Sequence, residues 1–214
     1  KITCLNAPEA NRDAVGEHAL MMLLTLLNKL MKADTEVRKG IWLREENRGI
    51  ELQGKTVGII GFGNMGSAFA KKLSGFDVNI IAYDPYKTID TVEYPYIKQV
   101  SLVQLQKEAD IISLHVPLTT ETKYMINDTF INLCKKEIYI INTARGKCVN
   151  TADLVKHLKT GKVKGTCLDV HEYETSSFEK LETLPEPFEY LINSDKTILT
   201  PHIAGWTHES NKKI

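Results

Sequence analysis

Three short polar segments each follow an apolar run that is typical of a buried strand. Arg145 lies in NTARG after IYII, Glu174 lies in LDVHEYE after VKGTC, and His202 lies in TPHIAG after TIL. A guanidinium binds a carboxylate and polarises a carbonyl, and an imidazole beside a carboxylate exchanges a proton near neutral pH. These side chains therefore suit acid–base chemistry on a small substrate that carries a carboxylate and a carbonyl or hydroxyl. Glu172 is nearby and is the alternative carboxylate.

A glycine-rich segment earlier in the chain indicates that a dinucleotide takes part. Residues 61–66 read GFGNMG between the expected strand KTVGII and an expected helix, and Asp84 ends the next expected strand. In such a GxGxxG loop the first glycine permits the tight turn, the second lets the backbone approach a pyrophosphate, and the third lets the helix pack on the strand. Asp84 can accept both hydroxyl protons of the adenine ribose and would repel a 2′-phosphate, which favours NAD over NADP. Because free amides at a helix N-terminus bind phosphate, the predicted phosphate contacts are Gly61, Gly63, Asn64, Met65 and Gly66.

Together these features suit hydride transfer between NAD and a 2-oxo acid. Such a reaction needs a cation for the substrate carboxylate, an acid–base for its hydroxyl, and a carboxylate that raises the pKa of that base. The candidates for these three roles are Arg145, Glu174 or its neighbour Glu172, and His202.

The elements that would position these residues alternate from residue 54 onward. The expected strands are apolar on both faces, which is typical of a parallel sheet covered by helices on both sides. They span 55–60, 78–82, 110–115, 138–142, 163–168 and 197–199, and the expected helices span 65–73, 101–108, 127–133 and 151–159. We predict an α/β fold with a doubly wound parallel sheet, the Rossmann fold, whose carboxyl edge carries the site. The acidic residues 172–194 are expected to be a surface excursion.

Residues 11–39 show one long helical pattern, with apolar residues dense enough to cover more than one face. We predict a single crossover helix that ends before Gly40 and packs on this chain's own core or on a second subunit. His18 within it is expected to be a packed or interface residue and not a catalytic one. Three other histidines are expected in exposed places: His157, His171 and His208.

Composition argues against several other classes of protein. The chain of 214 residues has 27 Lys plus Arg and 27 Asp plus Glu, a balance that argues against nucleic acid as a partner. The longest apolar stretch, residues 19–27, is far too short to span a bilayer, so we expect no membrane association. The cysteines form neither a CxxC pair nor a zinc-spaced cluster, so we expect no metal and reduced thiols in the cytoplasm. They are Cys4, Cys134, Cys148 and Cys167.

The ordered motifs together resemble the D-isomer-specific 2-hydroxyacid dehydrogenases over nearly the whole chain. They are NAPEANRDAVGEHAL, GIIGFGNMG, ADIISLHVPLTTETKYMIN, INTARGKCVNTADLVKHLKTGKVKGTCLDV and TPHIAGWTHE. The resemblance implies that Arg145 binds substrate, that Glu174 is the family's glutamate and that His202 is the proton donor and acceptor. It also implies cofactor contacts, with Asp169 near the nicotinamide carboxamide. The implied contacts are His115, Val116, Pro117, Thr143, Ala144, Arg145, Asp169, His202 and Gly205.

Two positions depart from the family pattern: Thr175 stands where a proline usually follows the glutamate, and Trp206 stands where many members have a smaller residue. The resemblance further implies that most of the substrate domain is absent, so we expect this chain alone to be a poor catalyst. Residues 1–12 would be a remnant of that domain, 13–53 the crossover helix and arm, 54–205 the NAD-binding domain and 206–214 the start of a returning helix. A homodimer is expected through residues 13–39.

The substrate is the least determined feature. TPHIAGWTHES and the NAPEAN opening most resemble the 3-phosphoglycerate dehydrogenase branch of the family, while glycerate or hydroxypyruvate and D-lactate stay open as substrates. A non-enzymatic alternative is an NAD-sensing binding module like the corepressors related to the family, which can keep the same three catalytic residues. A Rossmann hydrolase that uses NAD internally is disfavoured by the combination of the ARG, LDV and TPH motifs.

Overall fold

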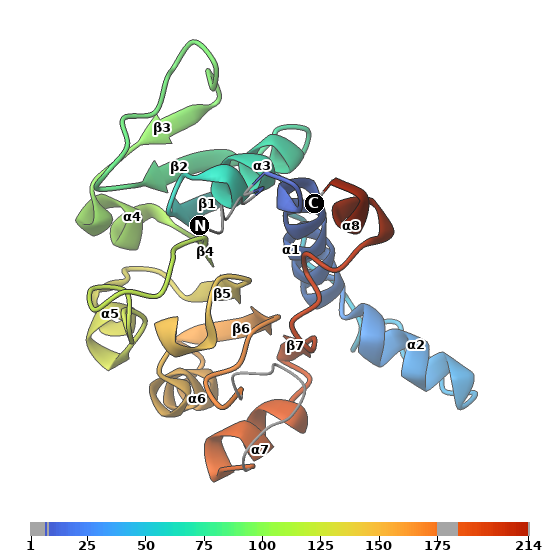
Figure 1. Ribbon diagram of the computed structural model, residues 1–214. Coiled ribbons are helices and arrows are strands. Elements are labelled where there is room, and N and C mark those ends of the chain that lie inside the picture. Colours follow the sequence, from blue (N-terminus) through green and yellow to red (C-terminus); the bar gives the residue numbers. More distant parts are fainter. Residues whose placement is uncertain (1–6, 8, 175–183, 214) are drawn as a thin grey trace, which may run out of the picture.

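The computed structural model describes residues 7, 9–174 and 184–213 of the chain (Figure 1). In this described part, seven strands form one sheet in the order β3-β2-β1-β4-β5-β6-β7, and every adjacent pair is parallel. The strands are β1 Thr56–Ile60, β2 Asn79–Tyr83, β3 Ile97–Gln99, β4 Ile111–Leu114, β5 Ile138–Asn142, β6 Val163–Leu168 and β7 Thr197–Leu199. The predicted doubly wound parallel sheet is confirmed. The sequence pattern does not predict β3, because only one of its three residues is buried.

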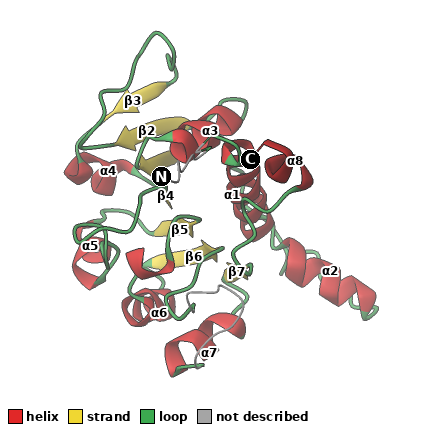
Figure 2. Ribbon diagram, in the orientation of Figure 1, coloured by secondary structure: helices red, strands yellow, loops and turns green. Residues whose placement is uncertain are grey.

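Helices cover both faces of the sheet, as Figure 2 shows in red around the yellow strands. One face carries α1 and α3 over a core that includes Leu23 and Phe69, and the other carries α4, α5 and α6 over a core that includes Leu105, Ile131 and Leu158. The helices are α1 Arg12–Leu27, α2 Leu30–Arg38, α3 Asn64–Leu73, α4 Leu102–Glu108, α5 Asp128–Leu133, α6 Thr151–Thr160, α7 Glu186–Ile192 and α8 His208–Lys213. All five of the named core side chains are fully buried, so each face of the sheet rests on its own apolar layer.

Caps fix the ends of several of these helices. The side chains of Ser101, Asn127 and Asn150 each accept a hydrogen bond from a backbone N–H in the first turn of α4, α5 and α6. Gly40 with φ 72° follows α2, and Gly161 with φ 81° ends α6. The helix end before Gly40 agrees with the prediction from the sequence.

The prediction of a single helix over residues 11–39 is wrong, because the chain breaks between α1 and α2. Lys29 adopts the left-handed conformation with φ 51°, and the N–H of Ile50 donates to the carbonyl oxygen of Leu27 at 3.0 Å. A left-handed residue ends the i→i−4 ladder. α1 then packs on the sheet, whereas α2 has no buried residue and projects away from the sheet (Figure 1).

Residues 172–194 are more than a surface excursion, because they contain α7, which buries Phe188 and Leu191. This helix packs against α6 and β7. Residues 175–183, and with them the departure at Thr175, lie outside the described residues.

The prediction that His157 is solvated is also wrong. The residue is 4% exposed in α6, and its Nε2 lies 2.9 Å from Oδ1 of Asp128, the first residue of α5. The helical pattern of α6 alone does not show that α5 supplies this partner. His208 is exposed in α8, as expected.

Candidate active site

The predicted site residues gather at the carboxyl edge of the sheet, each in a loop that follows a strand. Open parallel sheets bind their ligands at this edge, where the strand order reverses. Here the order reverses between β1 and β4, which are neighbours in the sheet. The loops after β1, β2, β4, β5, β6 and β7 respectively carry Gly61, Asp84, His115, Thr143, Asp169 and His202. Within the described residues there is no cluster of His, Cys, Asp and Glu that could hold a metal ion, and no helix there is long and apolar enough to cross a membrane.

The loop between β1 and α3 has the geometry of a phosphate cradle. Gly61 has φ 89°, and a Cβ at this position would lie 2.5 Å from the carbonyl oxygen of His115. A Cβ on Gly66 would overlap the carbonyl oxygen of Gly61, whereas a Cβ on Gly63 would meet nothing within 4 Å. Gly63 therefore leaves open space beside the backbone. α3 begins at the next residue, Asn64, so its unpaired N–H groups start at the same place.

The carboxylate of Asp84 organises this loop. Its Oδ2 accepts a hydrogen bond from the N–H of Phe62 at 2.8 Å, and its Oδ1 accepts one from the N–H of Tyr86 at 2.9 Å. A carboxylate oxygen can accept two hydrogen bonds, so both oxygens keep the capacity to bind ribose hydroxyls.

A cavity of about 480 Å³ lies between the loops that follow β2 and β4. The hydroxyl of Tyr86 donates to Oε2 of Glu121 at 2.5 Å and joins the two loops, and this carboxylate raises the pKa of Tyr86. Asp84 and Gly63 lie in the same lining. The apolar part of the lining is made by Ile60, Leu102, Val116, Met125 and Phe130. An apolar slot with carboxylates in its lining fits an adenine base and its ribose.

Two buried polar atoms in the predicted cofactor segments, His115 Nδ1 and Thr143 Oγ1, have no hydrogen-bond partner among the described residues. The other ring nitrogen of His115, Nε2, lies 2.8 Å from Oγ of Ser113, and burial lowers the pKa of His115 to about 3, so the ring is neutral. Buried polar atoms in native proteins are nearly always paired. These two atoms, the open space at Gly63 and the apolar cavity together fit a bound dinucleotide.

The turn that carries Arg145 is shaped by Asn142, a residue that the sequence analysis did not single out. Asn142 is fully buried; its Oδ1 accepts from the N–H of Ala144 and its Nδ2 donates to the carbonyl oxygen of Arg145, both at 3.0 Å. Arg145 itself is exposed, and its Nη1 donates to the carbonyl oxygen of Ala144 at 2.6 Å. A Cβ on Gly146 would overlap the carbonyl oxygen of His171. The arginine turn therefore packs directly on the segment that leads to Glu174.

The structure pairs Glu174 with His202. Glu174 Oε2 lies 2.9 Å from His202 Nδ1, and the N–H of His171 donates to the other carboxylate oxygen, Oε1. The hydrogen bond to Glu174 raises the pKa of His202 because the carboxylate stabilises the imidazolium, while desolvation and the Arg145 cation act in the opposite direction. Glu174 and Arg145 therefore both lie close enough to His202 to act on it electrostatically.

The alternative carboxylate, Glu172, serves the start of α6 instead. Its Oε2 accepts a hydrogen bond from the N–H of Thr151 at 2.9 Å, and a hydrogen bond with the Tyr124 hydroxyl raises the pKa of that tyrosine. The two glutamates that the sequence left open thus occupy different places, and only Glu174 contacts the imidazole.

The buried carboxylate of Asp169 holds the loop that carries His202. Asp169 is 1% exposed; its Oδ1 accepts from the hydroxyl of Thr200 at 2.6 Å and from the N–H of Ile203 at 2.9 Å. Its Oδ2 accepts from the N–H of Ala204 at 2.9 Å, and its carbonyl oxygen accepts from the N–H of His202 at 2.7 Å. The contact of Asp169 with a nicotinamide carboxamide stays a prediction.

Two residues that the sequence analysis did not place in the site complete these connections. The carbonyl oxygen of Thr200 accepts a hydrogen bond from His171 Nε2 at 2.9 Å. Hydrogen bonds thus form a closed ring, which runs through Asp169, Thr200, His171, Glu174 and His202. His171 is partly buried in this ring, so the expectation of an exposed position is wrong. Its place beside the LDV motif was the available signal.

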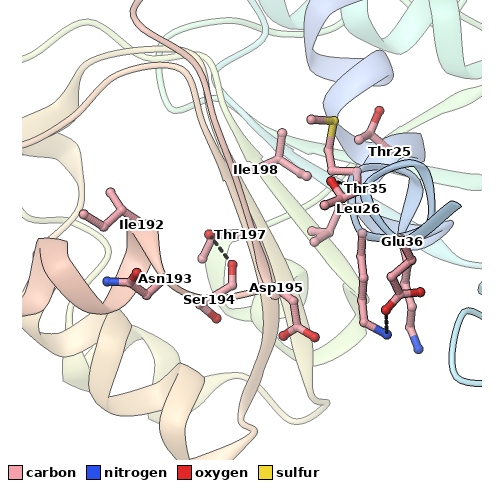
Figure 3. Close-up of a pocket in the computed structure, with 13 residues that line it drawn as sticks. Thr25, Leu26, Thr35, Glu36, Ile192, Asn193, Ser194, Asp195, Thr197 and Ile198 are labelled. Carbon is pink, nitrogen blue, oxygen red and sulfur yellow. Dashed lines mark hydrogen bonds and ion pairs between the residues drawn. The ribbon is translucent and has the colours of Figure 1, made fainter. Parts of the chain in front are cut away.

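A second cavity, of about 510 Å³, lies between the junction of α1 with α2 and residues 192–198 (Figure 3). Its lining combines apolar side chains such as Leu26 and Ile198 with Lys32 and Glu36, which form an ion pair at 3.2 Å. None of the predicted site residues lines this cavity, so it is separate from the candidate active site.

Comparison with known proteins agrees with a dinucleotide site at the carboxyl edge of the sheet. Residues 20–204 match the family model described as D-isomer specific 2-hydroxyacid dehydrogenase, NAD binding domain. The chain is 36% identical over 213 residues to a D-3-phosphoglycerate dehydrogenase of Archaeoglobus fulgidus, and the match covers 100% of this chain and 39% of that relative. It is 40% identical to a glyoxylate reductase of Thermofilum pendens, with 98% of this chain and 60% of the relative covered.

Among solved structures, the D-lactate dehydrogenase of Aquifex aeolicus, complexed with NAD and lactic acid, is similar to this chain with a TM-score of 0.87. The sequence identity is 36%, and the match covers 97% of this chain and 64% of that one. The chain thus spans less than two thirds of the length of each of these three relatives.

Proposed function

The chain belongs to the D-isomer specific 2-hydroxyacid dehydrogenase family through its NAD-binding domain, and we propose that the protein oxidises a D-2-hydroxy acid, or reduces the corresponding 2-oxo acid, with NAD. The observation that carries this proposal is the Glu174–His202 pair, 2.9 Å apart at the carboxyl edge of the sheet. The nearby cavity and unpaired polar atoms fit the dinucleotide. When bound, NAD would supply or accept the hydride at the substrate carbon.

This chain's residues would hold the cofactor along its whole length. The N–H groups of residues 61–66 would bind the pyrophosphate, and Asp84 would bind the adenine ribose and disfavour a 2′-phosphate. The apolar cavity would take the adenine. Thr143 Oγ1 would donate to or accept from the cofactor, which would give this buried hydroxyl the partner that it lacks among the described residues.

His202 would exchange the proton that accompanies hydride transfer. Because Glu174 holds Nδ1 and orients the ring, we assign the exchange to Nε2. In reduction, hydride adds to the carbonyl carbon of the substrate while its oxygen takes the proton from the imidazolium; oxidation runs in reverse. The raised pKa of His202 favours the imidazolium. Arg145 would bind the substrate carboxylate and polarise the carbonyl.

For the substrate we propose 3-phosphoglycerate and its 2-oxo product, which would place the protein in serine biosynthesis. The A. fulgidus relative supports this choice, while a glyoxylate reductase and a D-lactate dehydrogenase are similarly close relatives. Glyoxylate, hydroxypyruvate or glycerate, and D-lactate are therefore the alternatives.

Nucleotide binding and turnover test this function separately. Calorimetric titration of the chain with NADH and with NADPH is expected to show a preference for NADH that weakens in Asp84→Ala. The complete protein is then assayed with a panel of 2-oxo acids. NADH binding without turnover of any of them would favour an NAD-sensing binding module, and failure to bind either nucleotide would contradict the proposed site.

We also propose that a second copy of the chain covers α2. This helix buries no residue, and contiguous exposed apolar surface commonly marks an interface. Exposed apolar side chains on α2 and in the segment that follows it include Leu30, Met31, Val37, Ile41 and Trp42. Light scattering is expected to give a dimer that Met31→Lys with Val37→Lys converts to a monomer. A monomeric parent chain would contradict the proposal.

A cytoplasmic location is the last part of the proposal. The described cysteines, Cys134, Cys148 and Cys167, are free and buried. Burial raises the pKa of Cys134 to about 11, so this thiol stays protonated and unreactive. Free thiols suit a reducing compartment.

A further inference from the structure

His18 reaches from α1 into the hydrogen-bonded ring described above. Its Nε2 lies 3.0 Å from the hydroxyl oxygen of Thr200 and 3.4 Å from Oδ1 of Asp169, and its side chain is only 10% exposed. We propose that His18 is a positioning residue, which holds the loop that carries His202 against α1. The functional importance of that loop rests on the proposed function, but the stability of the loop can be measured without an activity assay.

The directions of the hydrogen bonds make His18 a donor to the Thr200 hydroxyl. The Thr200 hydroxyl has one proton, which it donates to Asp169 Oδ1 at 2.6 Å. The sulfur of Met22, 3.8 Å from the same hydroxyl, is a weak acceptor and does not compete with the carboxylate for this proton. The hydroxyl oxygen must therefore accept at its contact with His18, so the proton between these two residues belongs to His18 Nε2. The bonds thus run in one direction, from His18 to Thr200 to Asp169. A histidine that only filled space in α1 would not need this donor.

The loop needs to be held on both sides of His202. His202 has φ 59°, a left-handed conformation that non-glycine residues rarely adopt and that persists only where the surroundings impose it. Asp169 imposes it by binding residues 200, 203 and 204 around the histidine. His18 adds a donor from a different element to the hydroxyl that binds this carboxylate.

His18 also helps to keep the Asp169 carboxylate ionised. Burial by itself would raise the pKa of Asp169, but the polar contacts with His18, with Thr200 and with the N–H groups of residues 203 and 204 outweigh burial and hold this pKa below its ordinary value. An ionised carboxylate accepts stronger hydrogen bonds from the loop than a protonated one. His18 lies outside residues 20–204, which match the NAD-binding domain of the family. The first turns of α1, which precede the matched residues, therefore contribute to holding this loop.

The test compares His18→Leu, which removes the donor, with His18→Gln, whose side-chain amide keeps one, in the 214-residue chain. Amide hydrogen exchange is followed at Ile203 and Ala204, whose N–H groups bind Asp169, and at Ile112 in β4 as the global reference. We expect exchange at the two loop amides to become at least about tenfold faster in His18→Leu. Exchange at Ile112 is expected to stay within about threefold of the parent, and His18→Gln to restore most of the loop protection.

A second readout is the pKa of His202, measured by NMR titration. Loosening of the loop should weaken the contact with Glu174, so this pKa is expected to fall in His18→Leu and to recover in His18→Gln. Unchanged exchange at Ile203 and Ala204, equal acceleration at Ile112, or a glutamine variant that behaves like the leucine variant would each overturn the proposal. If His18→Leu does not fold, Thr200→Val with Thr200→Ser as its control makes the same comparison from the other end of the bond. None of these outcomes depends on NADH binding or on substrate.

Discussion

Oδ2 of Asp84 accepts a hydrogen bond from the backbone N–H of Phe62 at 2.8 Å, so the residue expected to select the cofactor also shapes the loop proposed to bind its phosphates. One side chain at the end of β2 is thus expected to affect both the choice of cofactor and the geometry of the loop. Two substitutions at Asp84 can separate these contributions, because asparagine keeps an acceptor oxygen and loses the charge.

We predict that Asp84→Ala weakens NADH binding by about 10-fold to 100-fold, since hydrogen bonds to a charged group contribute roughly 1.5–3 kcal/mol. Asp84→Asn should lose less NADH affinity and should bind NADPH better than the parent does, because the repulsion of the 2′-phosphate is gone. Calorimetry measures both, and Asp195→Ala, an exposed aspartate far from the cradle in sequence, is the control. Unchanged NADH affinity in Asp84→Ala would contradict this reading of the site.

Two glycines of the same loop should respond differently to alanine. In Gly66→Ala the new Cβ overlaps the carbonyl oxygen of Gly61, so we expect a loss of about 3 kcal/mol or more in the free energy of unfolding, measured with urea. In Gly63→Ala the Cβ meets nothing within 4 Å. Stability should then be nearly unchanged while NADH binding weakens, because the methyl group occupies the space meant for the pyrophosphate. Equal stability of the two variants would contradict the geometry of the cradle.

The pKa of His202 should depend on Glu174 and not on Glu172. NMR titration is expected to give a His202 pKa above 6.5 in the parent and a lower value in Glu174→Gln, whereas Glu172→Gln should leave it in place. Because the folded-state pKa is raised, the pair stabilises the fold fully below pH 6.5, and this contribution is lost as pH rises through the folded-state value. The stability difference between the parent and Glu174→Gln should therefore shrink as pH rises over that range. A larger effect from Glu172→Gln would reverse the assignment.

Arg145 should matter for substrate and not for folding. In the complete protein, Arg145→Gln is expected to lower kcat/KM for the 2-oxo acid by about 100-fold or more, because a charge-assisted contact with the carboxylate and carbonyl is lost. The melting temperature should change little, since the side chain is exposed. Lys147→Gln, which removes an exposed charge two residues away, is the matched control. Wild-type kinetics in Arg145→Gln would exclude this arginine from substrate binding.

Much of the fold follows from local patterns in the sequence. Apolar runs without polar alternation predict buried parallel strands, and a glycine-rich turn between a strand and a helix predicts the phosphate cradle, because both depend on residues adjacent in the chain. The same locality explains why β3 and the break at Lys29 are not predicted. β3 has one buried residue, and the apolar pattern runs through Lys29 without a break, so neither leaves a periodic pattern to find.

The sequence by itself determined the family, the parallel sheet and the edge of the sheet that carries the candidate site, since each of these follows from short contiguous motifs. The tertiary structure alone decided which glutamate contacts His202, that His171 and Thr200 close the ring, and that His18 reaches it from α1. These relationships join residues up to 182 positions apart. They depend on how the loops pack against one another beyond the strand ends. The pattern of residues within one segment does not show which other loop its side chains will contact.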